Sequence, residues 1–590
     1  MKKRILCLLL VMLMAVSALT ALTACGKKDP VVTDPCAEGH TYTKGNGRCD
    51  VCNKKCKHTD ADGNKVCDVC SYELNEEEEE EYPEVPWIND SPVNLFFRMT
   101  HNSSSESLPS GCERYMAGED ASKSETLDEN VATRNADAEF FTNVKLKYDY
   151  YADTGEYGWG NCHEIIHSEV KSGASGTPDM YCNFAYDMIA SSLKGSFSNL
   201  MNSGEHDQGN FFQFMDEDYD ETVNNRGYMY DYMGSVTLSL TKKYILASDY
   251  FTDAVRSFFV VPVNVALLES VGKDVTGDLN KDGEFTIDDF YIEVKDRKWD
   301  YDKVIDYSAA IYEPTGTSNA GEDIEDVLGF VLFLGFQSSG LLYSSDITVI
   351  NKVWDDATGD YLYTYPAESE ELYKLFDNCK RLVNSTGVYV MSGDPNTTKY
   401  GSSNLIATRE RFCDSKILFG GIIILGALEY SSYQRLKDAD GFGVVPVPLY
   451  KPAEGNDRYL TTITNGARVG AIARSTKNFT ACTAFLDYQS SHSQEILDGY
   501  YYRYLCVSIV DSTVQGTVDM LYYLRLNVRS SFDKSFEDAV GVYYGVTNTC
   551  WSHILETKYF DYDIRPDYGE LAASKEGYLN QLYLVYFDLP

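Results

Sequence analysis

Basic residues are scarce in this chain. Its 590 residues include 51 lysines and arginines against 90 aspartates and glutamates, so the formal net charge is −39 at pH 7. Nucleic acid and anionic lipid surfaces carry dense negative charge and would repel such a chain. We therefore expect no nucleic-acid partner.

Two signatures of catalysis are missing, and so is any later membrane span. The chain has no Gly-x-Ser-x-Gly and no phosphate-binding glycine loop. Its apolar runs at 328–336 and 417–428 are well short of the ~20 residues that a spanning helix needs, so we expect both in the core. We expect no enzymatic activity, although a glycosidase needs only a pair of carboxylates and the 90 acidic residues offer many.

The N-terminus has the layout of an export signal. Lys2, Lys3 and Arg4 precede an apolar run at 5–22, and Thr23-Ala24 leads directly into Cys25. Small residues directly before a cysteine resemble the lipobox of a bacterial lipoprotein. We expect cleavage before Cys25, its acylation, and lipid anchoring at the extracellular face of the membrane. The alternative is an uncleaved membrane helix, because the run is only just long enough to span.

Cysteine and histidine repeat together between residues 36 and 70. A Cys-x3-His-x8-Cys-x2-Cys copy is followed by a Cys-x-His-x8-Cys-x2-Cys copy. Each copy offers three thiols and one imidazole, which suits a closed tetrahedral zinc site, so we expect two zinc ions. Disulfides are the alternative outside the cell, but they would not explain the recurring histidine. The expected ligands are Cys36, His40, Cys49, Cys52, Cys56, His58, Cys67 and Cys70.

Eight further cysteines have no regular spacing, and we expect most of them to be free buried thiols. They are Cys112, Cys162, Cys182, Cys379, Cys413, Cys482, Cys506 and Cys550. A run of six glutamates at 76–81, followed by Pro83 and Pro86, indicates an extended linker. The predicted organisation is a signal peptide at 1–24, a tether at 25–35, a Cys/His-rich zinc module at 36–72, an acidic linker at 73–90, and a large domain at 91–590.

Within the large domain, strand and helix patterns alternate. Apolar or alternating runs at 93–99, 143–150 and 179–182 predict strands, and 125–141 and 164–171 predict helices. The order β-α-β-α-β is typical of α/β architecture.

Several segments, taken in order, resemble one known family. They lie at 127–135, 169–173, 178–180, 257–264, 296–303, 411–419 and 441–448, the last reading Gly-Phe-Gly-Val-Val-Pro-Val-Pro. From about Val93 to the C-terminus the chain resembles the extracellular solute-binding proteins of ABC transporters, a family that includes sugar binders. The resemblance implies a two-lobed periplasmic-binding-protein-like (type II) α/β fold. Lobe one would take about 91–256 and 416–470 and lobe two about 257–415, with C-terminal helices at 471–590 packing across both.

Ligands in such folds sit beyond the C-terminal ends of strands, in a cleft that hinge closure buries. This rule nominates aromatic and polar residues in the expected turns. The alternative is packing under a helix N-terminus for Phe184 and Tyr186, helix capping for Asn183, and a solvent-facing strand edge for Tyr230 and Tyr232. The candidates are Trp159, Asn183, Phe184, Tyr186, Tyr230, Tyr232, Trp354 and Tyr430.

Residues 278–289 match a calcium-binding loop. Oxygen-bearing side chains stand at positions 1, 3, 5 and 12 and glycine at position 6, as in one dockerin repeat. We expect one calcium ion, with an Asx-rich turn as the alternative. The expected ligands are Asp278, Asn280, Asp282, Asp289 and the backbone carbonyl of Glu284.

Together these features predict a lipid-anchored capture component of an ABC importer, with a membrane permease as its partner. The chain has 46 tyrosines but only 27 phenylalanines, and phenol rings can stack on sugar while staying hydrated. We expect an uncharged oligosaccharide as ligand. The alternatives are a surface adhesion or scaffold lipoprotein, or a peptide binder.

Overall fold

The computed structural model describes residues 92–101, 112–118, 125–152, 160–201, 210–212, 227–239, 241–316, 325–333, 340–348, 350–357, 359–364, 369–391, 404–429, 432–433, 435–436, 441–450, 459–464, 466–506, 515–530, 535–536, 563, 565–566, 569–570, 573 and 582. The chain divides into two compact units, Met1–Glu81 with Asn89–Ser91 and Tyr82–Ile88 with Pro92–Pro590, and all described residues belong to the second. None of the helices in these ranges is long and apolar enough to cross a membrane. Cys25 and the eight expected zinc ligands lie outside them.

The first sheet contains β1 (Val93–His101), β2 (Val144–Ala152), β3 (Met180–Phe184) and β13 (Arg468–Ile472), in the order β13-β3-β1-β2. β1 runs parallel to both β2 and β3, and β13 is antiparallel to β3. β2 alternates buried or half-buried residues with exposed Lys145 and Lys147, as expected for a strand at the sheet edge. The crossover helices α2 (Glu125–Thr142) and α3 (Cys162–Ser172) complete the predicted β-α-β-α-β order.

Short helical elements surround this sheet. They are η1 (Cys112–Ala117), α4 (Ala185–Leu193), α5 (Tyr230–Ser235) and α6 (Thr252–Arg256). The polypeptide crosses to the second sheet immediately after α6, because β4 begins at Phe259.

The second sheet has the order β10-β4-β9-β5-β8, with β11 also paired to β4. Its strands are β4 (Phe259–Asn264), β5 (Leu328–Phe333), β8 (Val388–Met391), β9 (Ile417–Phe419), β10 (Ile423–Ile424) and β11 (Phe442–Val445). The associated helices are α7 (Val265–Val275), α8 (Ile287–Lys295), α9 (Tyr301–Ile311), α10 (Gly340–Tyr343), α11 (Glu370–Val383), α12 (Asn404–Cys413) and η5 (Leu425–Glu429). The side chains of Asn264, Asp300 and Ser369 accept N-terminal backbone N–H groups and so cap α7, α9 and α11.

Alternate residues of the second sheet face two hydrophobic cores. Val260 and Val331 lie in the core that also buries the first sheet, whereas Val261 and Phe330 lie in a second core. Such a sheet is covered on both faces, which explains the continuous apolar runs in its strands. Trp299 is fully buried in the second core and donates from Nε1 to the carbonyl of Pro446 at 2.9 Å.

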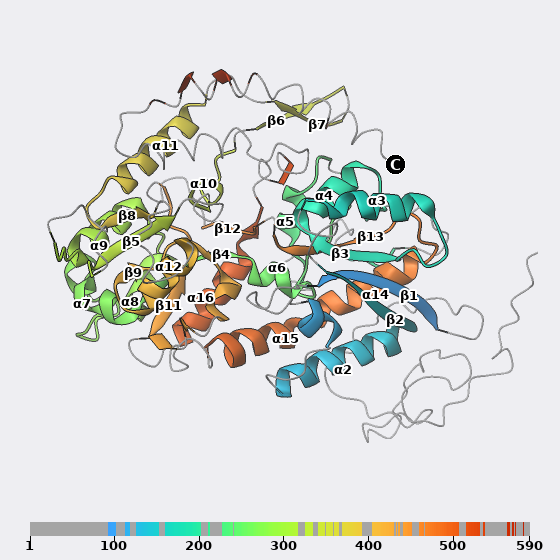
Figure 1. Ribbon diagram of the computed structural model, residues 1–590, viewed down its shortest axis with the longest axis horizontal. Helices are drawn as coiled ribbons and strands as arrows, with labels where there is room; N and C mark the ends of the chain where they lie inside the picture. Colours follow the sequence, from blue (N-terminus) through green and yellow to red (C-terminus); the bar gives the residue numbers. More distant parts are fainter. Residues whose placement is uncertain are drawn as a thin grey trace, which may run out of the picture. The chain divides into compact units, whose positions relative to one another are not determined.

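The predicted two-lobed α/β fold is confirmed, since Figure 1 shows the strands of the second sheet gathered apart from β1, β2, β3 and β13. One boundary differs. The sequence placed 416–470 in lobe one, but β9, β10 and β11 hydrogen-bond in the second sheet, and only β13 joins the first. The sequence of a short buried strand does not indicate which sheet it joins, because buried strands of both sheets consist of the same apolar residues.

The C-terminal elements contact both lobes. α14 (Phe479–Ser491) and α15 (Gln494–Asp498) pack against α2, and η6 (Gly499–Cys506) follows them. α16 (Gln515–Leu526) packs against β11 and α8, and β14 (Val528–Arg529) pairs with β12 (Thr461–Thr462). These contacts agree with the expectation that C-terminal helices pack across both lobes.

Candidate functional site

A pocket of about 400 Å³ opens where α5 meets the hairpin of β6 (Asn351–Asp355) and β7 (Asp360–Thr364). The hairpin is inserted in the chain of the second lobe, whereas α5 precedes the crossing and belongs to the first. The lining residues are Tyr230, Asp231, Gly234, Ser235, Thr237, Ser239, Lys243, Thr348, Ile350, Lys352, Tyr361, Tyr363 and Arg529.

The register of the hairpin places four side chains on one face. Lys352 pairs with Tyr363 and Trp354 pairs with Tyr361, and directly opposed residues in an antiparallel pair share a face. Lys352, Tyr361 and Tyr363 line the pocket, so Trp354 continues the same face beyond it. Trp354 is 47% exposed and packs edge-on against Tyr361 at 5.3 Å between ring centroids. The predicted site residue Trp354 therefore stands beside the pocket.

Buried contacts fix the hairpin to the first lobe. The hydroxyl of Ser239 donates to Oδ2 of Asp360 at 2.5 Å, and Asp360 is only 5% exposed. Ile350 and Tyr363 are buried in the core that also holds the first sheet. The turn is closed by a hydrogen bond from Gly359 N to the carbonyl of Asp355, with Gly359 at a φ of 68° that favours glycine.

Three cationic side chains reach the pocket from different segments. Lys243 is 7% exposed, and its Nζ lies 5.9 Å from the ring centroid of Tyr230. Lys352 Nζ lies 4.0 Å from the ring centroid of Tyr361, and Arg529 pairs with Asp346 at 2.6 Å. Burial lowers the pKa of Lys243, and the charge of Lys352 lowers it further. Burial also lowers the pKa of Lys352, against the opposing effect of Asp360.

Tyr230 and Tyr232 have different positions. Their alternation suggested a strand edge, but the segment forms helix α5. Residues two apart on a helix do not share a face, so Tyr230 is exposed and lines the pocket while Tyr232 is buried at 1% exposure in the first core. The hydroxyl of Tyr232 has no hydrogen-bond partner within the described structure. Tyr230 thus joins the candidate site, and Tyr232 occupies a core position.

Asn183, at the end of β3, has its polar groups used inside the lobe. Its Oδ1 accepts from the hydroxyl of Thr100 at 2.5 Å and from Phe184 N at 2.7 Å, and its Nδ2 contacts Cys162 Sγ at 2.6 Å. Phe184 lies under the guanidinium of Arg468, 4.8 Å from its centroid. Tyr186 is 7% exposed and does not line the pocket. This group matches the packing alternative better than ligand contact.

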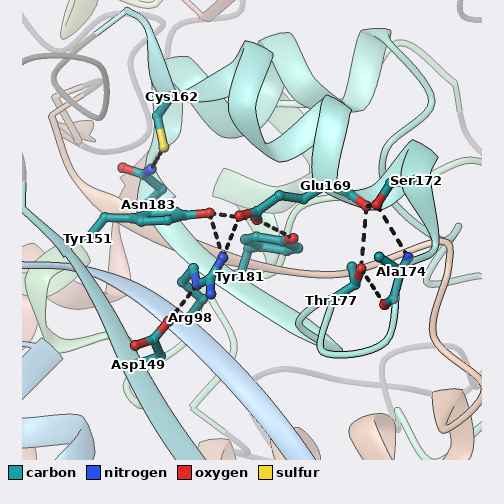
Figure 2. A network of polar contacts seen from close by, with 10 residues as sticks. All are labelled: Arg98, Asp149, Tyr151, Cys162, Glu169, Ser172, Ala174, Thr177, Tyr181 and Asn183. Carbon is teal, nitrogen blue, oxygen red and sulfur yellow. Dashed lines mark hydrogen bonds and ion pairs between the residues drawn. The ribbon is translucent and has the colours of Figure 1, made fainter.

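Figure 2 shows that Asn183 adjoins a larger polar network centred on Glu169 of α3. Glu169 accepts from Arg98 at 2.5 Å, from the hydroxyl of Tyr151 at 2.6 Å and from that of Tyr181 at 2.8 Å. Arg98 also donates to Asp149 at 2.8 Å. Burial raises the pKa of both Tyr151 and Tyr181, so both remain neutral donors. The network attaches α3 to β1, β2 and β3.

One catalytic pattern does occur at 163–167, which reads His-Glu-Ile-Ile-His at the start of α3. In zinc hydrolases two such histidines bind one metal ion together with a third ligand. Here His163 Nδ1 lies 3.2 Å from Asp187 Oδ1, His167 Nδ1 lies 3.2 Å from Ser196 Oγ, and Glu164 pairs with Lys194. Over the ranges given above, no group of three or more His, Cys, Asp or Glu side chains could hold a metal ion. The pattern therefore brings no metal centre together among these residues.

The calcium-like loop is held together by hydrogen bonds between its own residues. Asp278 accepts from the backbone N–H groups of Lys281, Asp282 and Gly283. Asp289 is fully buried and accepts from Leu279 N, Asn280 N and Thr286 N at 2.8 to 2.9 Å. The loop is thus folded by its own hydrogen bonds, and its calcium remains a prediction.

Other expectations fall on different parts of the chain. Trp159 and Tyr430 lie outside the described residues. Cys162, Cys379, Cys413 and Cys482 are free and buried, as expected, and Cys182 is also buried. Lys243, Lys352, Tyr361, Tyr363 and Arg529 were missed by the sequence argument. The one available signal for the hairpin was the alternation of Lys352 with Trp354 and of Tyr361 with Tyr363 about a turn.

No protein-family model and no curated protein matches this chain. Among solved structures, the chain is similar to the GacH receptor of Streptomyces glaucescens, with 14% identity, a TM-score of 0.43, and 84% of this chain and 100% of that one covered. It is also similar to the galacto-N-biose-/lacto-N-biose I-binding protein of the ABC transporter from Bifidobacterium longum, with 12% identity, a TM-score of 0.46, and 83% and 98% covered. The sugar-binding protein MalE from Xanthomonas citri matches with 10% identity, a TM-score of 0.46, and 84% and 100% covered. The solved structures that this chain is similar to thus include sugar-binding proteins of ABC transporters, at identities that transfer no ligand to it.

Proposed function

We propose that this protein is the substrate-binding component of an ABC importer, and that it captures a carbohydrate in the pocket between α5 and the β6–β7 hairpin without catalysing a reaction. The main observation behind this proposal is that the segments that form the pocket walls come from different parts of the chain. One wall is formed by α5 of the first lobe, and the other by a hairpin that the chain of the second lobe contributes, so segments of both lobes surround the pocket.

The lining suits a sugar. Tyr230 and Tyr361 offer rings that can pack on the apolar face of a pyranose while their hydroxyls stay hydrated. Ser235, Thr237 and Ser239 also line the pocket, but their hydroxyls donate within the protein, to the carbonyls of Tyr232 and Lys242 and to Asp360. The volume of about 400 Å³ falls in the range of small-molecule sites.

A buried ionic network lies where the chain crosses between the lobes. Arg256, just before the crossing, donates to Asp253 and to Glu429 at 2.7 Å. Arg468, on the returning strand β13, donates to the other oxygen of Asp253 at 2.7 Å. This network supports the proposal because a binding protein of this kind needs a well-defined connection about which its lobes can move.

A thermal-shift screen of the full-length chain over oligosaccharides, peptides and metal chelates tests the proposal. A ligand at 100 times its Kd adds roughly 2.7 kcal/mol of stability. We expect an oligosaccharide to stabilise the chain, and Tyr361→Ala to remove that effect. Val353→Ala should retain it, because Val353 is an exposed residue on the opposite face of the same hairpin.

Other outcomes would redirect the assignment. Stabilisation by peptides alone would make the protein a peptide binder, and product formed from any glycan would make it an enzyme. No stabilisation by any soluble compound would favour the adhesion or scaffold alternative. The lipid anchor at Cys25 and a membrane permease as partner belong to the same proposal.

A further inference from the structure

The pocket is cationic although the chain is strongly acidic. The whole sequence has a formal net charge of −39, yet the lining contains Lys243, Lys352 and Arg529 against a single carboxylate, Asp231. Local charge, not net charge, decides what enters a cleft, because low-dielectric walls concentrate the field of the groups that line it.

Lys243 is the most informative of these groups. It is 7% exposed, and its side chain contacts the ring of Tyr230 but has no ion-pair partner in the described parts of the chain. Buried lysines are normally paired, because an unpaired ammonium loses hydration without compensation. Lys243 lines the pocket, so a ligand bound there could supply the missing partner for its ammonium group.

Lys352 approaches from the opposite wall. It also lacks an ion-pair partner at the described positions, and its charge acts unfavourably on Lys243. The neighbouring carboxylate of Asp360 already accepts from Ser239 and from Tyr361 N, and Arg529 is paired with Asp346. Two unpaired ammonium groups that repel each other across a cavity leave a site that an anion would stabilise.

We propose that the carbohydrate carries an anionic group, a carboxylate or a sulfate ester, which is bound between Lys243 and Lys352. The inference rests on the proposed function and narrows its ligand class from carbohydrates in general to anionic carbohydrates. It replaces the uncharged oligosaccharide that the composition suggested. The tyrosines hold the sugar ring, and the two lysines select the charge. Lys243 contributes most, because its burial keeps competing water away from the ion pair.

The test compares matched ligands on the full-length chain by calorimetry. The ligands are a galacturonate disaccharide, its methyl ester, galactobiose, sulfated galactobiose, and inorganic sulfate alone. We expect at least one charged sugar to bind roughly tenfold or more tighter than its neutral counterpart, because a charge-assisted contact is worth more than a neutral one. Comparing the uronate with the sulfated sugar identifies the anion, and the preference should weaken as salt rises.

Lys243→Met and Lys352→Met should each reduce this preference toward unity, where the preference is the ratio of the charged-sugar affinity to the neutral-sugar affinity measured on the same variant. Lys374→Met is the matched control, since Lys374 is an exposed lysine on α11 that pairs with Glu371. Lys352→Met also keeps the test decisive if the buried Lys243 variant fails to fold, because Lys352 is exposed.

Equal or tighter binding of the neutral sugars would overturn this inference and leave the proposed function intact. Inorganic sulfate binding as tightly as the sulfated sugar would overturn it as well, because the sugar would then contribute nothing. If no carbohydrate binds, the proposed function fails together with the inference.

Discussion

At the residue scale, burial separates side chains that look alike in the sequence. Tyr230 and Tyr232 are two positions apart, but one lines the pocket and the other is enclosed in the core. Asn183 and Trp354 show the same contrast, since the amide is bonded within its lobe and the indole stands on the exposed face of the hairpin.

Trp354→Ala should weaken carbohydrate binding about fivefold, because an aromatic contact beyond simple burial is worth about 1 kcal/mol. Global stability should hardly change, since the indole is 47% exposed. Calorimetry with the best ligand from the screen measures the affinity. Leu526→Ala, at a residue 71% exposed on α16, serves as a control that should have no effect. Unchanged affinity in the Trp354 variant would place the indole outside the site.

Glu429→Ala should lower the free energy of unfolding by about 3 kcal/mol, because it removes one of the two carboxylates that compensate the buried guanidinium of Arg256. Glu429 accepts from both Arg256 and the hydroxyl of Tyr500, and its side chain is only 3% exposed. Denaturant unfolding gives the value. Asp302→Ala, which breaks an exposed pair with Arg381, should cost less than about 1 kcal/mol. A similar small loss for both variants would contradict a structural role for the crossing network.

At the element scale, local signals located the first strands and helices of the domain, between residues 93 and 182, but not the sheet partners of the later strands. Asp300 and Ser369 mark helix starts through capping hydrogen bonds that depend only on nearby residues. The hairpin β6–β7 is equally local, yet its contact with Ser239 joins positions 121 residues apart.

The loop 278–289 should bind one calcium ion, and millimolar calcium should then raise the Tm of the chain. Asp278→Ala should abolish the calcium-dependent rise, besides a calcium-independent loss from three missing backbone hydrogen bonds. Asp296→Ala, just after α8, controls for loss of an acidic side chain. An identical Tm with calcium and with chelator would leave only an Asx-rich turn.

The repeat at 36–70 should hold two zinc ions, because its eight ligands divide into two Cys3His sets. Elemental analysis of the full-length chain measures zinc per molecule. Cys52→Ser and Cys70→Ser should each remove about one ion by leaving one set incomplete. A mass decrease consistent with three disulfides, without zinc, would replace metal by covalent cross-links.

At the scale of the whole molecule, two sheets share one continuous core. Val260 and Val331 of the second sheet pack in the same core as the first sheet. α14 and α16 contact the two lobes separately. The pocket is built from segments of both lobes, which the polypeptide connects near Arg256 and near Arg468.

Cys25→Ser should release the protein from the membrane fraction, because acyl chains contribute roughly 0.8 kcal/mol for each buried methylene. Detergent partitioning of the wild-type and variant chains measures this. Cys7→Ser lies inside the expected signal and should have no effect on partitioning. Membrane retention of the Cys25 variant would favour the uncleaved helix.

The sequence alone determined the features that depend on neighbouring residues. Periodicity predicted the β-α-β-α-β start, ordered segments predicted two α/β lobes, and the lack of regular spacing predicted free buried cysteines such as Cys379 and Cys482. Only the tertiary structure decided which sheet 417–445 enters and which polar groups remain without partners. Asn183 and Lys243 could equally have faced a ligand, but Asn183 is bonded within its lobe while Lys243 lines a cavity unpaired. The pocket is made from segments more than 100 residues apart, and no local pattern reports a contact at that separation.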